Sequence, residues 1–274
     1  MKKLLSTILL IILLCEVACI PASAFERPEH DNYTECVLFG EFHSNALNEK
    51  QQNAIKLLDC ALYLTIDQFN GYGVGEYSTL KDAGVVNLPE LYEINFTANS
   101  STHRSYTHRG WDFNYQDDKA NWEVRKEILR STTKKVFPGF INDKQCDAFC
   151  ALLYYVHIVA DGIYDTSYKK TDLQMPVGGR AGRDNQDAIQ EILKILPLIF
   201  PSQTNKLTYI RLVVSLKSLD FKMTKLNTST GGINTKEKFD EYHSYTEEVR
   251  QVLYARIYRL LQKEPFFINV FPLV

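Results

Sequence analysis

The sequence predicts an all-α protein: a single-domain, multi-helix bundle with two long loops. Of its 274 residues, 45% are hydrophobic and 23% are charged, which is ordinary for a globular chain. Apolar residues recur every three to four positions over most of the chain, the period of an amphipathic helix. No internal repeat or low-complexity linker interrupts it, so the chain fits one sizeable domain.

Helical spacing is clearest in six segments. The segment 143–164 is apolar on all sides, which is typical of a helix buried at the centre of a bundle. The other five show one apolar face and one polar face. The six predicted helices cover residues 45–69, 122–137, 143–164, 184–200, 206–219 and 236–261.

Two segments between these helices are predicted to be long loops. Residues 70–117 contain five of the chain's glycines and Pro89 among mixed polar and aromatic side chains. Residues 166–183 include Gly178-Gly179-Arg180, which we interpret as a turn. Long loops in compact domains are usually functional or mobile, so we expect functional residues there.

The N-terminus has the pattern of a signal peptide. Lys2 and Lys3 precede an apolar run at 4–14, and Ala22-Ser23-Ala24 is a small-x-small cleavage pattern. We expect cleavage after residues 1–24, a mature domain over 25–274 beginning at Phe25, and a secreted, periplasmic or extracellular protein. The alternative, a permanent membrane anchor, is disfavoured because the apolar run is too short to span a bilayer.

Export changes the interpretation of the cysteines. Four remain in the mature chain: Cys36, Cys60, Cys146 and Cys150. An even number in an oxidising compartment predicts disulfides, and we expect at least one bridge between the first two and the last two. A metal-binding quartet is the competing interpretation, but no C-x-x-C spacing supports it.

The net charge argues against one class of partner. With 31 basic and 33 acidic residues the formal charge is −2, so the chain lacks the broad basic field of a protein that holds duplex DNA by its phosphates. We therefore expect no stable nucleic-acid complex. A small phosphate-containing substrate remains compatible, because a metal ion can supply positive charge locally.

Candidate metal ligands come from histidines that have a carboxylate four residues later, on the same helix face. The two pairs are His157 with Asp161 and His243 with Glu247. One such pair is most often an ordinary ion pair. Two pairs in different helices, together with His43 at a helix start and His108 in a loop, form an N/O ligand set that suits zinc.

Four short motifs then resemble one known family, the zinc-dependent phospholipase C and S1/P1 nuclease superfamily. CALLYYVHIVAD at 150–161 resembles its helix with His-x-x-x-Asp, and EYHSYTEEV at 241–249 its later helix with His-x-x-x-Glu. YTHRGWDFNY at 106–115 is similar to its loop histidine, and FHSNALNEKQQNAI at 42–55 to the histidine that starts its first long helix. These motifs are distributed over most of the mature chain.

The resemblance implies an exported, all-α enzyme that binds one to three zinc ions. One zinc would be bound by His108, His157, Asp161 and Glu93, a second by His43 and Asp161, and a third by His243 and Glu247. Asp161, shared between two metals, is the candidate catalytic residue. Asp112 and Tyr155 are candidates to orient the ligands.

Two features depart from the family pattern. Family members begin with a tryptophan that binds zinc, whereas here the only tryptophans are Trp111 and Trp122. The family also has a further histidine after its His-x-x-x-Asp, and the corresponding stretch GIYDTSYKK has none. Asp165 is the candidate substitute for that ligand.

The resulting expectation is a secreted zinc-dependent phosphoesterase that hydrolyses phospholipid or nucleic-acid phosphodiester bonds through a metal-activated water. One alternative is a degenerate, non-catalytic relative that acts as an exported binding or interaction protein. The other is an unrelated helical protein whose His–carboxylate pairs are coincidental. Contact with a membrane surface stays open, as do the choice between lipid and nucleic-acid substrates and the oligomeric state.

Overall fold

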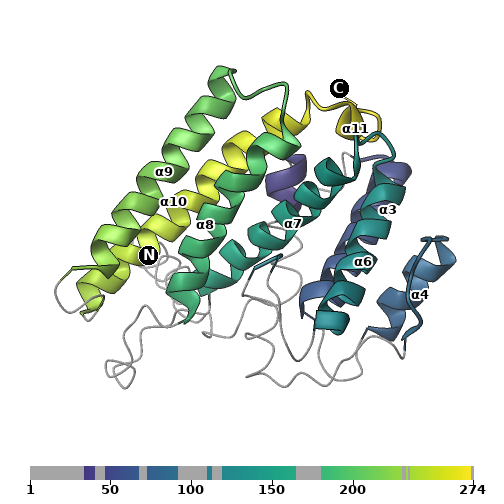
Figure 1. Ribbon diagram of the computed structural model, residues 1–274, viewed down its shortest axis with the longest axis horizontal. Helices are drawn as coiled ribbons and strands as arrows, with labels where there is room; N and C mark the ends of the chain where they lie inside the picture. The colour runs from purple at the N-terminus through teal and green to yellow at the C-terminus, as the bar shows by residue number, and fades with distance from the viewer. Residues whose placement is uncertain are drawn as a thin grey trace, which may run out of the picture.

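The computed structural model (Figure 1) is an all-α bundle, which confirms the predicted fold class. The residues that the structure describes contain helices and turns but no strand. Within 119–121, 161–164 and 180–185 the structure describes the backbone only. No described helix is long and apolar enough to cross a membrane. The described residues are 34–40, 47–67, 73–91, 110–112, 119–164, 180–229, 233 and 235–272.

The helices follow the chain from a short helical segment at 34–39 to the C-terminus. Helix α3 runs directly into the π-helical turn η2, and α9 and α10 form a long hairpin at one edge of the bundle (Figure 1). The bounds are α3 Glu49–Leu62, η2 Tyr63–Asp67, α4 Val74–Asp82, α6 Lys119–Val136, α7 Asp143–Tyr164, α8 Arg180–Ile199, α9 Leu207–Asn227, α10 Lys236–Leu261 and α11 Pro265–Ile268.

Helix α7 is the central buried helix that the sequence predicts. Every side chain from 148 to 160 is buried, because α6, α8 and α10 all pack against α7. Its bounds agree with the prediction, as do those of α10. The aromatic rings of Phe137, Phe149 and Phe266 pack edge to face where α11 meets α6 and α7, at centroid distances of 5.3 to 5.9 Å.

Several predicted boundaries are wrong. Helix α3 begins at Glu49 rather than 45, because Asn48 and Gln51 form a capping box in which each side chain accepts the other's backbone N–H at 3.0 Å. Helix α9 extends beyond 219 because Met223 continues its buried stripe. Helix α8 begins at Arg180, inside the second predicted loop.

The first predicted loop is also wrong in part, because it contains helix α4. Gly73, at φ 103°, takes the left-handed conformation immediately before this helix. Tyr77 and Leu80, three residues apart, are its two buried side chains, and α4 packs on α3. Most of the two predicted loops, and the predicted signal peptide, lie outside the described residues.

The predicted disulfide bridge is absent. Cys36, Cys60, Cys146 and Cys150 are all free, buried thiols. Helix α6 packs against both α3, which contains Cys60, and α7, which contains the last two cysteines, so α6 separates the helix of Cys60 from that of Cys146 and Cys150. Burial, followed by the negative charge of Glu35, raises the pKa of Cys36 to about 12, so this thiol stays protonated at neutral pH.

Candidate functional site

The segment 110–112 is fixed on α7 by three hydrogen bonds. The Gly110 N–H donates to the Tyr154 hydroxyl at 3.1 Å, and the Trp111 N–H donates to the Tyr155 hydroxyl at 3.0 Å. The Trp111 indole N–H donates to Asp147 Oδ2 at 3.2 Å. Gly110 has φ 120°, a left-handed conformation that disfavours any side chain at this position.

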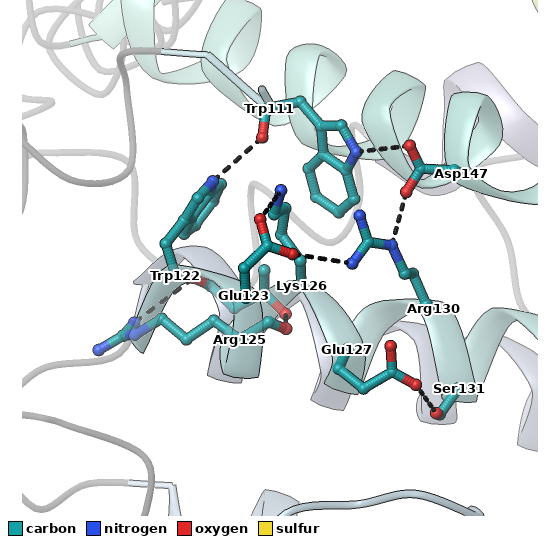
Figure 2. Close-up of polar contacts among 10 residues, drawn as sticks. Trp111, Trp122, Glu123, Arg125, Lys126, Glu127, Arg130, Ser131 and Asp147 are labelled. Atoms are coloured by element: carbon teal, nitrogen blue, oxygen red, sulfur yellow. Dashed lines mark hydrogen bonds and ion pairs between the residues drawn. The ribbon is translucent and has the colours of Figure 1, made fainter. Parts of the chain in front are cut away.

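Trp111 is buried between aromatic rings and two cations. The Trp122 indole N–H donates to the Trp111 carbonyl at 3.1 Å, and the two rings meet edge to face at 6.0 Å. Lys126 Nζ and Arg130 Cζ each lie 5.5 Å from the Trp111 ring centroid, which places positive charge over an aromatic ring. Figure 2 shows these side chains around the indole.

A charge network joins α6 to α7 beside this ring (Figure 2). Arg130 Nε lies 2.5 Å from Asp147 Oδ1, and Arg130 Nη1 lies 3.3 Å from Glu123. Lys126 Nζ is 2.6 Å from the other Glu123 oxygen. Burial opposes the charge on Arg130 and Glu123, but the hydrogen bonds outweigh it: the pKa of Arg130 is raised and that of Glu123 is lowered. Both groups are ionised at neutral pH.

A cavity of about 480 Å³ opens next to this network, lined by α6, α7, α8 and residues 111–112. Three cations line it, Arg130, Lys134 and Lys144, and apolar side chains of α7 and α8 complete the wall. The acidic lining residues are Asp112, Asp143, Asp147 and Glu191. A pocket with both charged and apolar walls suits a small polar ligand that also has an apolar part.

Two of the predicted site residues, Asp112 and Tyr155, line this cavity together. Burial raises the pKa of the Tyr155 phenol well above its usual range, so the hydroxyl stays protonated while it accepts the Trp111 N–H. His157 lies two residues further along α7 and is buried. Asp161 follows in the same helix, and its backbone is described.

The second His–carboxylate pair lies on α10, away from the cavity lining. His243 and Glu247 are half-buried. Glu247 accepts hydrogen bonds from Arg250, at 3.0 Å from Nε to each carboxylate oxygen, and from Gln251 at 3.0 Å. Burial opposes ionisation of Glu247, but these donors lower its pKa. The carboxylate thus has the partners of an ordinary helix ion pair.

The predicted convergence of the zinc ligands stays a prediction, because His43, Glu93 and His108 lie outside the described residues, as does the side chain of Asp161. In the described part of the chain, no group of three or more His, Cys, Asp or Glu side chains is placed to hold a metal ion.

Sequence reasoning missed the network of Glu123, Lys126, Arg130 and Asp147. Part of its signal was present, since Glu123 and Lys126 are three residues apart and Arg130 is seven residues after Glu123, so all three share one face of α6. The partner on α7 has no such signal, because the contact joins residues 17 positions apart across two helices.

No protein-family model, no curated protein and no solved structure matches this chain.

Proposed function

We propose that the protein is a secreted zinc-dependent phosphoesterase that hydrolyses phosphodiester bonds of phospholipids or nucleic acids. The observation that carries the proposal is the attachment of residues 110 and 111 to Tyr154 and Tyr155 of α7, the helix that also contains His157. His108 precedes Gly110 by two residues, which span at most about 7 Å of extended chain. The proposal requires His108 to approach this part of α7, and the short connection to Gly110 is compatible with that requirement.

The residues that would hold zinc follow from the motifs. His157 and Asp161 of α7 would bind with His108 and Glu93, and His43 would share Asp161. The third pair, His243 and Glu247, would have to give up the hydrogen bonds that Arg250 and Gln251 donate to the carboxylate. When bound, zinc would lower the pKa of a water molecule and stabilise negative charge on phosphoryl oxygens.

The cavity supplies groups that can position a phosphate ester. Arg130 and Lys134 already have carboxylate partners, Asp147 at 2.5 Å and Asp143 at 2.9 Å. Lys144 has no ion pair with any residue that the structure describes, so it can bind a phosphate oxygen without breaking an existing contact. The apolar wall beside it can accept the uncharged part of a substrate.

The test compares Asp161→Asn with Asp82→Asn, the same change at an exposed carboxylate of α4 that does not line the cavity. Zinc content is measured by mass spectrometry, and hydrolysis is measured with a soluble phosphodiester, with and without a chelator. We expect Asp161→Asn to lose zinc and to lose more activity than the about 10- to 100-fold that removal of an outer-shell partner costs. Asp82→Asn should keep both. Unchanged zinc and activity in Asp161→Asn would overturn the proposal.

One observation favours a second candidate, the exported binding or interaction protein without catalysis. Glu247 is engaged by Arg250 and Gln251, as expected if α10 contributes no metal site. This candidate predicts no more than one zinc ion per chain and no chelator-sensitive hydrolysis. The same two measurements therefore separate it from the enzyme.

A further inference from the structure

Helix α9 has an apolar stripe on the side that faces away from the bundle. The exposed fractions of its members lie between 44% and 69%, although all four are large apolar side chains. In Figure 1, α9 forms the edge of the bundle, with α8 and α10 on its inner side. The stripe consists of Leu207, Ile210, Val214 and Phe221.

This stripe is separate from the face that α9 contributes to the core. The core face consists of Tyr209, Leu212, Leu216, Leu219 and Met223, all buried. Leu207, Val214 and Phe221 follow one another at intervals of seven, and seven residues are nearly two full turns. The three side chains therefore line up along the helix on its outer side. A helix that is apolar on both sides needs a partner for the outer one.

Basic residues flank the apolar stripe on both sides. At 100° per residue, Lys217 lies on one side of Val214 and Arg211 on the other, and both are exposed. Lys206 and Lys225 add a cation near each end. None of these four has an ion pair within the described part of the chain.

Acidic residues are almost absent from this helix. Its one acidic residue, Asp220, is half-buried and accepts a hydrogen bond from Gln190 of α8 at 3.4 Å. Lys222, the remaining cation of α9, is paired with Glu248 of α10 at 3.5 Å. The outer face of α9 thus combines exposed apolar side chains with uncompensated positive charge.

We propose that the outer face of α9 binds an anionic phospholipid surface. An apolar stripe between basic residues is the pattern of a helix that lies in the plane of a membrane interface, where the apolar side chains enter the acyl boundary and the cations contact anionic headgroups. Charge complementarity disfavours a second copy of this chain, because pairing two such faces brings Arg211 and Lys217 against like charges.

This binding requires neither zinc nor hydrolysis, so it can be tested apart from the proposed enzyme. The mature protein is sedimented with phosphatidylcholine vesicles that contain about 30 mol% phosphatidylserine or none, in chelator to prevent any lipid hydrolysis. We expect binding to the anionic vesicles alone, and we expect it to weaken as NaCl rises from about 0.1 to about 0.5 M.

Two double variants test the two components of the face. Arg211→Gln with Lys217→Gln should weaken binding about 30-fold, the loss expected for two cations at an anionic surface. Val214→Ser with Phe221→Ser should weaken it at least about tenfold, since each such side chain contributes more than one tenfold step when buried. Neither change should alter hydrolysis of a soluble phosphodiester.

Matched controls change the same residue types elsewhere on the surface. Val86→Ser with Ile141→Ser removes two exposed apolar side chains, and Lys50→Gln with Lys56→Gln removes two exposed lysines of α3. Both controls should bind vesicles as the wild type does. The proposal is overturned if wild type binds neither vesicle, if the α9 variants bind like wild type, or if controls and α9 variants lose binding equally. It is also overturned if light scattering shows that the wild type is a dimer and that Phe221→Ser is a monomer, while neither protein binds vesicles.

Discussion

Replacing Asp147 with asparagine should destabilise the contact between the 110–112 segment, α6 and α7. Asp147 accepts from Arg130 through Oδ1 and from the Trp111 indole through Oδ2. Asparagine has one acceptor oxygen and one NH₂ group. In either orientation its NH₂ faces a donor, so at least one of the two hydrogen bonds is lost and the charge of Arg130 is compensated by Glu123 alone.

The magnitude follows from the charge and the exposure of the pair. A hydrogen bond to a charged group contributes about 1.5–3 kcal/mol. The Arg130 and Asp147 side chains are 23% and 37% exposed, so solvent screens part of this energy. We therefore expect Asp147→Asn to lower the free energy of unfolding by about 2 kcal/mol, which lowers Tm by roughly 4–8 °C in a domain of this size.

Urea unfolding monitored by tryptophan fluorescence measures this effect at the site itself, because Trp111 and Trp122 are the chain's only tryptophans. The matched control is Asp143→Asn. The side chains of Asp143 and of its partner Lys134 are 89% and 52% exposed, so their ion pair should contribute less than about 0.5 kcal/mol. A double-mutant cycle with Arg130→Met should give a coupling energy of about 1 kcal/mol or more. Equal destabilisation by the two asparagine variants would refute the reasoning.

Three further predictions concern stability and thiol chemistry. Burial raises the pKa of Glu264, whose carboxylate accepts a hydrogen bond from Gln203. The contribution of Glu264 to the free energy of unfolding is therefore present below its ordinary pKa of about 4.5 and is lost as pH rises through the raised pKa of the folded state. Glu264→Gln should therefore raise Tm at pH 7 but not at pH 4, and equal shifts at both pH values would contradict this. Gly139→Ala would place a Cβ 2.9 Å from Phe266 Cα and should cost about 1–3 kcal/mol by urea unfolding, whereas Gly75→Ala, with open space around it, should be neutral or stabilising. The unfolded, unreduced mature protein should titrate four thiols that are unreactive in the folded state, and two or fewer would restore the disulfide prediction.

Most of the helical architecture follows from the sequence. Helices α7 and α10 are predicted with their observed bounds, because a long apolar pattern leaves little choice of where each helix can lie. Helix α4 is missed because only Tyr77 and Leu80 are buried in it. A helix this short depends on packing against α3 rather than on its own pattern.

The candidate site is less accessible to sequence reasoning. His157 and Asp161 are recognisable because they belong to one helix, and helical spacing relates residues within a few turns. The contacts of Trp111 with Asp147 and Tyr155 join segments 36 and 44 residues apart, and their pairing depends on how α7 packs in the bundle. The disulfide prediction was wrong because it also depended on how the helices pack. An even number of cysteines carries no information on which helices lie between the thiols.

The zinc content of the purified mature protein tests the central claim most directly. After exchange into metal-free buffer, the metal is counted per chain by mass spectrometry, in the wild type and in His157→Asn. The proposed enzyme predicts two or three zinc ions per wild-type chain and a clear decrease in the variant, since the buried His157 would be a ligand. A wild-type chain that contains no zinc, and that takes up none when zinc is added, would contradict it.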